Sequence, residues 1–169
     1  MKKYPHNILN ILIFLPIFLF MFFAITRCSH NHKDYNNDYK IAGSDDYSCK
    51  NRNMNLSNDE KSVFYEIGHL EGFFEVASAN LQENCQTKIH FDVKLNSGKA
   101  KLALIKPNGS VQILKEIISS GNKDYSEDLL VNCTPGINKI KIVGENFSGS
   151  FEISQPENKI FDYTKKSVF

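Results

Sequence analysis

The chain has 169 residues, with 20 Lys and Arg side chains against 19 Asp and Glu, which gives a formal net charge of +1. This length leaves room for one domain with a substantial hydrophobic core. The near-neutral charge argues against nucleic acid or an acidic polymer as a partner, because such partners select basic surfaces.

An export or anchoring segment is predicted at the N-terminus. Lys2 and Lys3 precede an apolar stretch over residues 8–25, and a basic start followed by a hydrophobic run is typical of an export signal. The run is also close to the length that spans a bilayer. The positive charges keep the N-terminus in the cytoplasm. We therefore expect residues 1–28 to be a signal peptide or membrane anchor and the rest to be extracytoplasmic in the cell envelope, or secreted after cleavage.

Cys28 follows this segment and is a candidate for lipidation. The stretch "ITRC", Ile25 to Cys28, resembles the lipobox of bacterial lipoproteins, but Arg27 stands where the pattern has a small residue. Signal peptidase cleavage near Thr26 or Cys28, or no cleavage at all, are the alternatives. Each alternative leaves the remainder of the chain outside the cytoplasm.

Residues 29–61 are polar and poor in aliphatic side chains, a composition that predicts a flexible tether. Within it, Asp34, Asn36, Asp38 and Asp45 stand at the first, third, fifth and twelfth positions of a calcium loop of the EF-hand kind. Tyr39 occupies the sixth position, where such loops have glycine. A calcium-dependent assembly module is therefore an alternative rather than the main interpretation.

Residues 62–155 alternate in short apolar and polar runs separated by turn residues. The clearest run is "TKIHFDVKL", in which every second residue is apolar, as expected of a strand with one buried face. "PNG" at Pro107–Gly109 predicts a tight turn, and we also expect turns at "EG", "NSG" and "ENFSG". About eight strands at this spacing predict an all-β, antiparallel β-sandwich of jelly-roll type. Residues 156–169 form a C-terminal tail that is either an edge strand or loose.

Two stretches, "KLALIKPNGSVQIL" and "CTPGINKIKIVGENFSGSFEIS", resemble small secreted or lipoprotein-type β-sandwich domains of Gram-positive bacteria, and the pattern is similar to the bacterial pre-peptidase C-terminal domain. The matching positions are Leu102, Leu104, Pro107, Gly109, Val111, Gly136, Ile140, Ile142, Gly144, Gly149, Phe151 and Ile153. The resemblance implies an accessory or binding module and supplies no catalytic residues.

Cys85 and Cys133 each lie in phase with buried positions of a predicted strand. Outside the cytoplasm such cysteines tend to oxidise, so the pair is a candidate disulfide. Two buried free thiols are the alternative.

The sequence contains no G-x-S-x-G or H-E-x-x-H pattern, and His90 faces solvent by its phase. The chain lacks tryptophan, so an aromatic platform for carbohydrate would have to use Tyr or Phe. The candidates are Tyr65, Phe73, Tyr125 and Phe147, of which Phe73 is expected to be the most exposed.

The sequence as a whole predicts a membrane-anchored protein with a non-catalytic binding or accessory role. Its expected partners are the membrane, through the N-terminal segment, and an envelope protein or glycan. No enzyme activity, cofactor or nucleic acid partner is expected. An envelope enzyme with an unrecognised site is the remaining alternative.

Overall fold

The computed structural model describes residues 34–118 and 123–164. The short helix α2 (Asp38–Ala42) comes first, followed by strands that pair antiparallel throughout. These are β1 (Asp46–Leu56), β2 (Ser62–Leu81), β3 (Cys85–Ile105), β4 (Val111–Ile118), β5 (Lys123–Cys133), β6 (Gly136–Ser154) and β7 (Asp162–Tyr163). The predicted all-β antiparallel class is confirmed, with seven strands in the described residues where about eight were expected.

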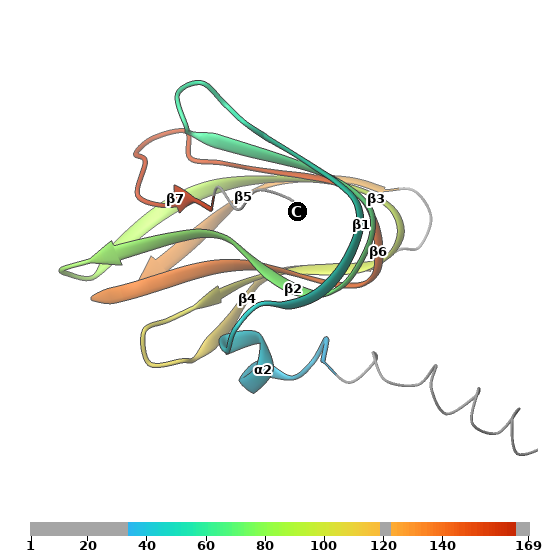
Figure 1. Ribbon diagram of the computed structural model, residues 1–169. Helices are drawn as coiled ribbons and strands as arrows, with labels where there is room; N and C mark the ends of the chain where they lie inside the picture. The colour runs from blue at the N-terminus through green and yellow to red at the C-terminus, as the bar shows by residue number, and fades with distance from the viewer. Residues whose placement is uncertain (1–33, 119–122, 165–169) are drawn as a thin grey trace, which may run out of the picture. The chain divides into compact units, whose positions relative to one another are not determined.

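The strands form one sheet that folds over into two layers (Figure 1). The path is β1-β2-β6-β3-β4, and β5 and β7 join it at β3 and β2. The long strands β2, β3 and β6 curve from one layer into the other, so β3 pairs with β5 up to Leu95 and with β4 from Lys99 onward. We name the two halves the β5 layer and the β4 layer.

Three of the predicted turns are bends inside these long strands. The sequence predicted chain reversals near Gly72, Gly98 and Asn146, but the backbone continues in the same strand with shifts of pairing register. Gly98 has a φ of +76°, and a Cβ there would lie 2.1 Å from the carbonyl oxygen of Asn146. Glycine and asparagine permit a β-bulge as well as a turn. The turn predicted at Pro107–Gly109 does reverse the chain, between β3 and β4.

The main core lies between the two layers. The alternation read in β3 is confirmed, since Ile89, Phe91, Val93 and Leu95 are all buried. Aromatic rings fill the centre, and Phe151 stacks on Tyr65 with 4.9 Å between ring centres. Burial of this apolar surface is the main favourable contribution to folding.

A second, smaller core lies on the outer face of the β4 layer, under residues 34–45, which we call the strap. Tyr35 and Ile41 of the strap are buried against Phe73, Ala103, Ile105 and Val143. The flexible tether predicted for residues 29–61 is therefore wrong from Asp34 onward, because the strap docks and β1 extends the sheet. Two apolar side chains suffice for docking because the sheet supplies the remaining apolar surface.

The C-terminal segment is held by one buried side chain. Gln155 is fully buried; its Oε1 accepts hydrogen bonds from the backbone N–H groups of Ile160 and Phe161, and its Nε2 donates to the Phe161 carbonyl. This loop positions β7 against β2 at Ala77 and Ser78. The tail therefore adds a short edge strand, one of the two outcomes the sequence left open. Among the described residues, no helix has the length and apolar character needed to cross a membrane.

Candidate functional site

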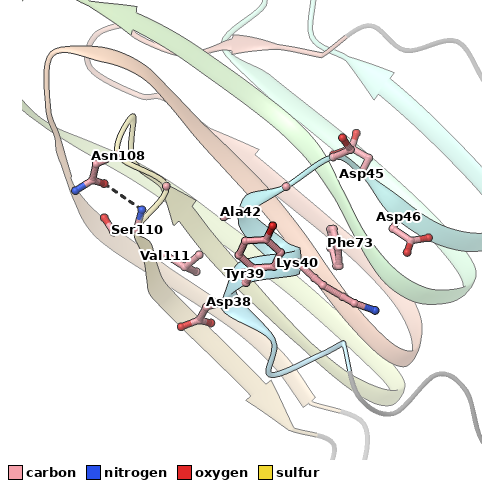
Figure 2. A pocket seen from close by; sticks show the side chains of 13 residues that line it. Asp38, Tyr39, Lys40, Ala42, Asp45, Asp46, Phe73, Asn108, Ser110 and Val111 are labelled. Atoms are coloured by element: carbon pink, nitrogen blue, oxygen red, sulfur yellow. Dashed lines mark hydrogen bonds between the residues drawn. The ribbon is translucent and has the colours of Figure 1, made fainter.

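An open depression of the described surface lies where the strap meets the bend of β2 and the turn between β3 and β4 (Figure 2). It is open to solvent and has a volume of about 1040 Å³. We call it the strap pocket. Its walls are strap residues Asp38–Lys40 and Ala42–Asp45, then Asp46 and Phe73, and turn residues Asn108–Val111.

Tyr39 is the most exposed large side chain of this pocket, with 90% of its surface accessible. Helix α2 presents it because Asn37 caps the helix, its Oδ1 accepting a hydrogen bond from the Lys40 N–H at 3.2 Å. In the view of Figure 2, Asp38 lies beside the Tyr39 ring, and Phe73 lies between that ring and Asp46. An aromatic ring displayed so openly is available to a ligand.

The opposite wall is a tight turn. The Asn108 side chain accepts a hydrogen bond from the Ser110 N–H at 3.0 Å, and Gly109 supplies a φ of +79°. These contacts fix the turn without using the Ser110 hydroxyl or the Asn108 amide N–H groups in any hydrogen bond to a described residue. The wall therefore offers both donors and acceptors.

The charges around the strap pocket fall into two groups. Lys40 Nζ forms an ion pair with Asp34 at 2.7 Å, and Lys141 Nζ forms one with Asp45 at 3.1 Å. Asp38 and Asp46 are exposed and have no ion-pair partner among residues 34–118 and 123–164. Their carboxylates are therefore accessible acceptors.

Buried lysines support the strap from below. Lys141 is 1% exposed and donates to the Gly43 carbonyl at 2.7 Å. Lys101 donates to Asn36 Oδ1 at 3.1 Å and lies 4.2 Å from the centre of the Tyr35 ring. Burial lowers the pKa of Lys101, and burial followed by the Glu116 carboxylate raises that of Tyr35. Oxygen atoms of the strap thus pair with lysine ammonium groups that would otherwise be buried in the sheet without a hydrogen-bond partner.

The four residues predicted as a calcium loop have other partners or positions. Asp34, Asn36 and Asp45 each contact a lysine ammonium group, and Asp38 is exposed in the first turn of α2. The described residues contain no group of three or more His, Cys, Asp or Glu side chains that could hold a metal ion. The structure therefore shows no calcium loop within residues 34–45.

The aromatic side chains proposed from the sequence are not the exposed ones. Phe73 is 1% exposed because the strap covers it, so the expectation that it is exposed is wrong. Tyr65 and Phe147 are core residues, and Tyr125 is half-buried with its hydroxyl donating to Glu127. Sequence reasoning missed Tyr39 because it lies in the segment interpreted as a tether, where no periodic pattern indicates a docked helix.

Cys85 and Cys133 are paired residues of β3 and β5. Directly opposite residues of antiparallel strands have Cα atoms about 4.5–5.5 Å apart, which lies within the range of a disulfide. Both thiols are free in the structure. Burial, followed by the neighbouring Cys85, raises the pKa of Cys133 to about 11. The disulfide stays a prediction. Cys28 lies outside the described residues.

A polar cluster around His90 occupies the outer face of the β5 layer. His90 Nδ1 lies 2.7 Å from Asp128 Oδ1, and Nε2 lies 3.2 Å from both Asp92 Oδ2 and Ser126 Oγ. The hydrogen bond to Asp128, with the charge of Asp92 in addition, raises the pKa of His90.

Serine, histidine and aspartate in contact resemble the composition of a hydrolase triad. Two carboxylates, however, favour the imidazolium form of His90, which cannot accept the Ser126 proton. The neighbouring backbone N–H groups lie in paired strands and are not directed at a developing oxyanion. The cluster therefore does not support the alternative of an envelope enzyme.

No family model matches the chain, and a search of curated proteins finds no match. Among solved structures, a mutant of the family 29 carbohydrate-binding module CBM29-2 complexed with mannohexaose is 12% identical, with 72% of this chain and 82% of that chain covered and a TM-score of 0.37. A carbohydrate-binding module from Cellvibrio mixtus lichenase 5A, in complex with cellotriose, is 12% identical over 75% of this chain and 95% of that one, also with a TM-score of 0.37. The resemblance to the pre-peptidase C-terminal domain stays a prediction.

Proposed function

We propose that this protein is an extracytoplasmic, membrane-attached binding module without catalytic activity, and that it binds a glycan of the cell envelope in the strap pocket. The observation that carries the proposal is Tyr39, an aromatic ring that is 90% exposed inside an open polar depression. An exposed aromatic side chain in a depression whose walls carry a few polar groups is typical of a ligand site.

The chemistry of the walls favours a sugar over an apolar ligand. A sugar ring presents C–H groups on its face and hydroxyl groups at its edge. The Tyr39 ring offers a surface for the face, and the carboxylates of Asp38 and Asp46 accept hydrogen bonds from the edge. Asn108 and Ser110 of the turn contact the far end of the same ligand. An apolar ligand would leave these polar groups unpaired, which disfavours its binding.

The attachment to the membrane is supported by the sequence of residues 1–28, where Lys2 and Lys3 precede the apolar run. The mode of attachment depends on Cys28, which is acylated or follows an uncleaved anchor, whereas cleavage beside it without acylation would release the chain. Each mode places the strap pocket outside the cytoplasm, where envelope glycans are found.

Substitution of Tyr39 tests the glycan site. The full chain in detergent micelles is titrated with cellohexaose, mannohexaose and the hexamer of N-acetylglucosamine, and binding is measured by calorimetry. We expect at least one oligosaccharide to bind, and Tyr39→Ala to weaken that binding by roughly tenfold or more, as for other aromatic anchors.

The matched control is Tyr39→Phe, which keeps the ring and should retain most of the affinity. Binding that Tyr39→Ala leaves unchanged, or no binding by any of the three oligosaccharides, would contradict the proposal. Because Tyr39 is exposed, neither substitution is expected to change the free energy of unfolding by more than about 0.5 kcal/mol.

A further inference from the structure

A second depression lies on the opposite side of the sandwich, on the outer face of the β5 layer. It has a volume of about 360 Å³ and includes Phe64, Asp92, Ser126 and Glu152 in its lining. The strap pocket shares none of these residues, so the two depressions are separate surfaces.

Strand register places these four residues in one line across four strands. Phe64 of β2 pairs with Glu152 of β6, Glu152 with Asp92 of β3, and Asp92 with Ser126 of β5. Paired residues of a sheet project on the same face. At about 4.8 Å between neighbouring strands, the line is about 14 Å long, the scale of a short oligosaccharide. We call it the outer row.

His90 holds two members of the outer row in position. Its Nε2 lies 3.2 Å from Asp92 Oδ2 and 3.2 Å from Ser126 Oγ, while Nδ1 is bound to Asp128 at 2.7 Å. A carboxylate and a hydroxyl fixed by one imidazole ring lose less conformational entropy when they bind a ligand. Phe64, 36% exposed, adds an aromatic ring at the other end of the row.

We propose that the outer row is a second binding site, for the hydroxyl groups of an extended oligosaccharide, and that His90 is its positioning residue. This site goes beyond the strap pocket and does not require it. Two glycan sites on opposite faces would also let one molecule contact two strands of a polymer, with the gain in avidity that follows.

The charges along the row favour a neutral sugar over a cationic peptide. Asp92 is offset by His90, and Asp128 by His90 and by Lys88 at 3.7 Å. Lys94 stands beside Asp124 in the register of β3 and β5. A cationic peptide would find this negative charge partly neutralised, with Glu152 left as a carboxylate that has no ion-pair partner in the described part of the chain, whereas hydroxyl groups can bond to the free lone pairs of all these carboxylates.

The site should depend on pH through the groups that face His90. These are Asp92 and Lys88 from β3, Asp128 and Ser126 from β5, and Glu152 from β6. The imidazolium donates a hydrogen bond to Asp128, and its positive charge attracts the Asp92 carboxylate. The neutral ring keeps the shorter bond to Asp128, so Nε2 becomes an acceptor that repels the Asp92 carboxylate. Asp92 is then released from its position.

The test uses the variant Tyr39→Ala, in which the strap pocket is impaired, so that binding at the outer row is observed alone. The full chain in micelles is titrated with the same three oligosaccharides, and backbone amide resonances are followed by NMR. We expect shifts at Asp92, Ser126 and Glu152, and their loss when Phe64→Ala is added. The affinity should fall by about fivefold from pH 6 to pH 8.5, the effect of one hydrogen bond, and His90→Gln should abolish this dependence.

Several results would overturn the second site. The second site is contradicted if none of the three oligosaccharides shifts the resonances of the outer row. It is also contradicted if the shifts remain after Phe64→Ala. A lysine tetrapeptide that perturbs the row where sugars do not would show a cationic peptide surface instead. If the sugars shift resonances of the outer row and Tyr39→Ala leaves the affinity unchanged, the second site is supported and the strap pocket is contradicted as a glycan site. If they perturb only the strap pocket of the unsubstituted chain, the reverse holds.

Discussion

His90 of β3 bonds to Asp128 of β5 on the outer face of the β5 layer, and this link depends on the charge of the imidazole. Its hydrogen bond to Asp128 raises the pKa of the imidazole, and the same bond lowers the pKa of the Asp128 carboxyl. The raised histidine pKa stabilises the fold fully below the unfolded value near 6.5, and this contribution is lost as pH rises through the folded pKa. The lowered aspartate pKa stabilises above about 3.9 and is lost as pH falls through the folded value.

We therefore predict that His90→Gln destabilises the protein most at mildly acidic pH, about 5 to 6, and progressively less as the pH rises above the folded pKa of His90. The thermal unfolding midpoints of the original and substituted chains, compared across this pH range, measure the effect. The control is the same substitution, to Gln, at His69, another histidine in a strand. A difference between the His90→Gln and original midpoints that stays constant with pH would contradict the link.

At the same scale, some side chains could be predicted from the sequence and others could not. The alternation of apolar and polar residues correctly predicted that Ile89 and Phe91 are buried, because side chains of a strand with one solvent-exposed face alternate strictly between the two faces. Phe73 broke this rule, because both faces of its strand are covered, one by the core and the other by the strap. The alternation pattern predicts burial only when it is known which faces of the strand are covered. For Phe73 the covering segment is the strap, which is distant in the sequence.

At the scale of elements, a buried ion pair helps to hold the strap to the sheet, in addition to the apolar contacts of Tyr35 and Ile41. Lys141 is almost fully buried, and its ammonium group is satisfied by the Gly43 carbonyl and the Asp45 carboxylate, both from the strap. Asp45→Asn keeps an acceptor for the Glu75 N–H, to which Asp45 bonds at 3.0 Å, but leaves the buried cation without its counter-charge. We expect a loss of about 2 kcal/mol in the free energy of unfolding, measured by urea denaturation.

The neighbouring substitution Asp46→Asn is the matched control, since Asp46 is exposed and has no ion pair among the described residues. It should change the stability by less than about 0.5 kcal/mol. Adding Lys141→Met to Asp45→Asn should restore part of the lost stability, because the buried charge is then removed. Equal effects of the two single substitutions would mean that the pair does not hold the strap.

The sequence predicts where strands lie more reliably than where they end. The run around Ile89 to Leu95 predicted a strand correctly, but Gly98 and Gly72 were interpreted as ends of strands. Their role depends on whether the partner strand bends at the same point, as β6 does near Asn146 opposite β3. Local sequence cannot distinguish a bulge from a turn when both use glycine at positive φ.

At the scale of the molecule, the docked strap shortens the segment that can act as a tether. The sequence predicted a tether over residues 29–61, but the described fold begins at Asp34. Only residues 29–33 of the predicted tether lie outside the described residues.

Attachment and disulfide formation can be tested together on the protein recovered from cells. We predict that it sediments with membranes, stays there in high salt and is released by detergent. The intact mass then shows whether the leader was cleaved and whether Cys28 carries an acyl chain, because each state has its own mass. A Cys85–Cys133 bridge makes the protein lighter by two hydrogen atoms until a reductant is added, and Cys133→Ser removes that difference, whereas Cys49→Ser leaves it. Recovery from the culture medium would contradict the anchor, and a mass unaffected by reductant would show that the opposed thiols remain free.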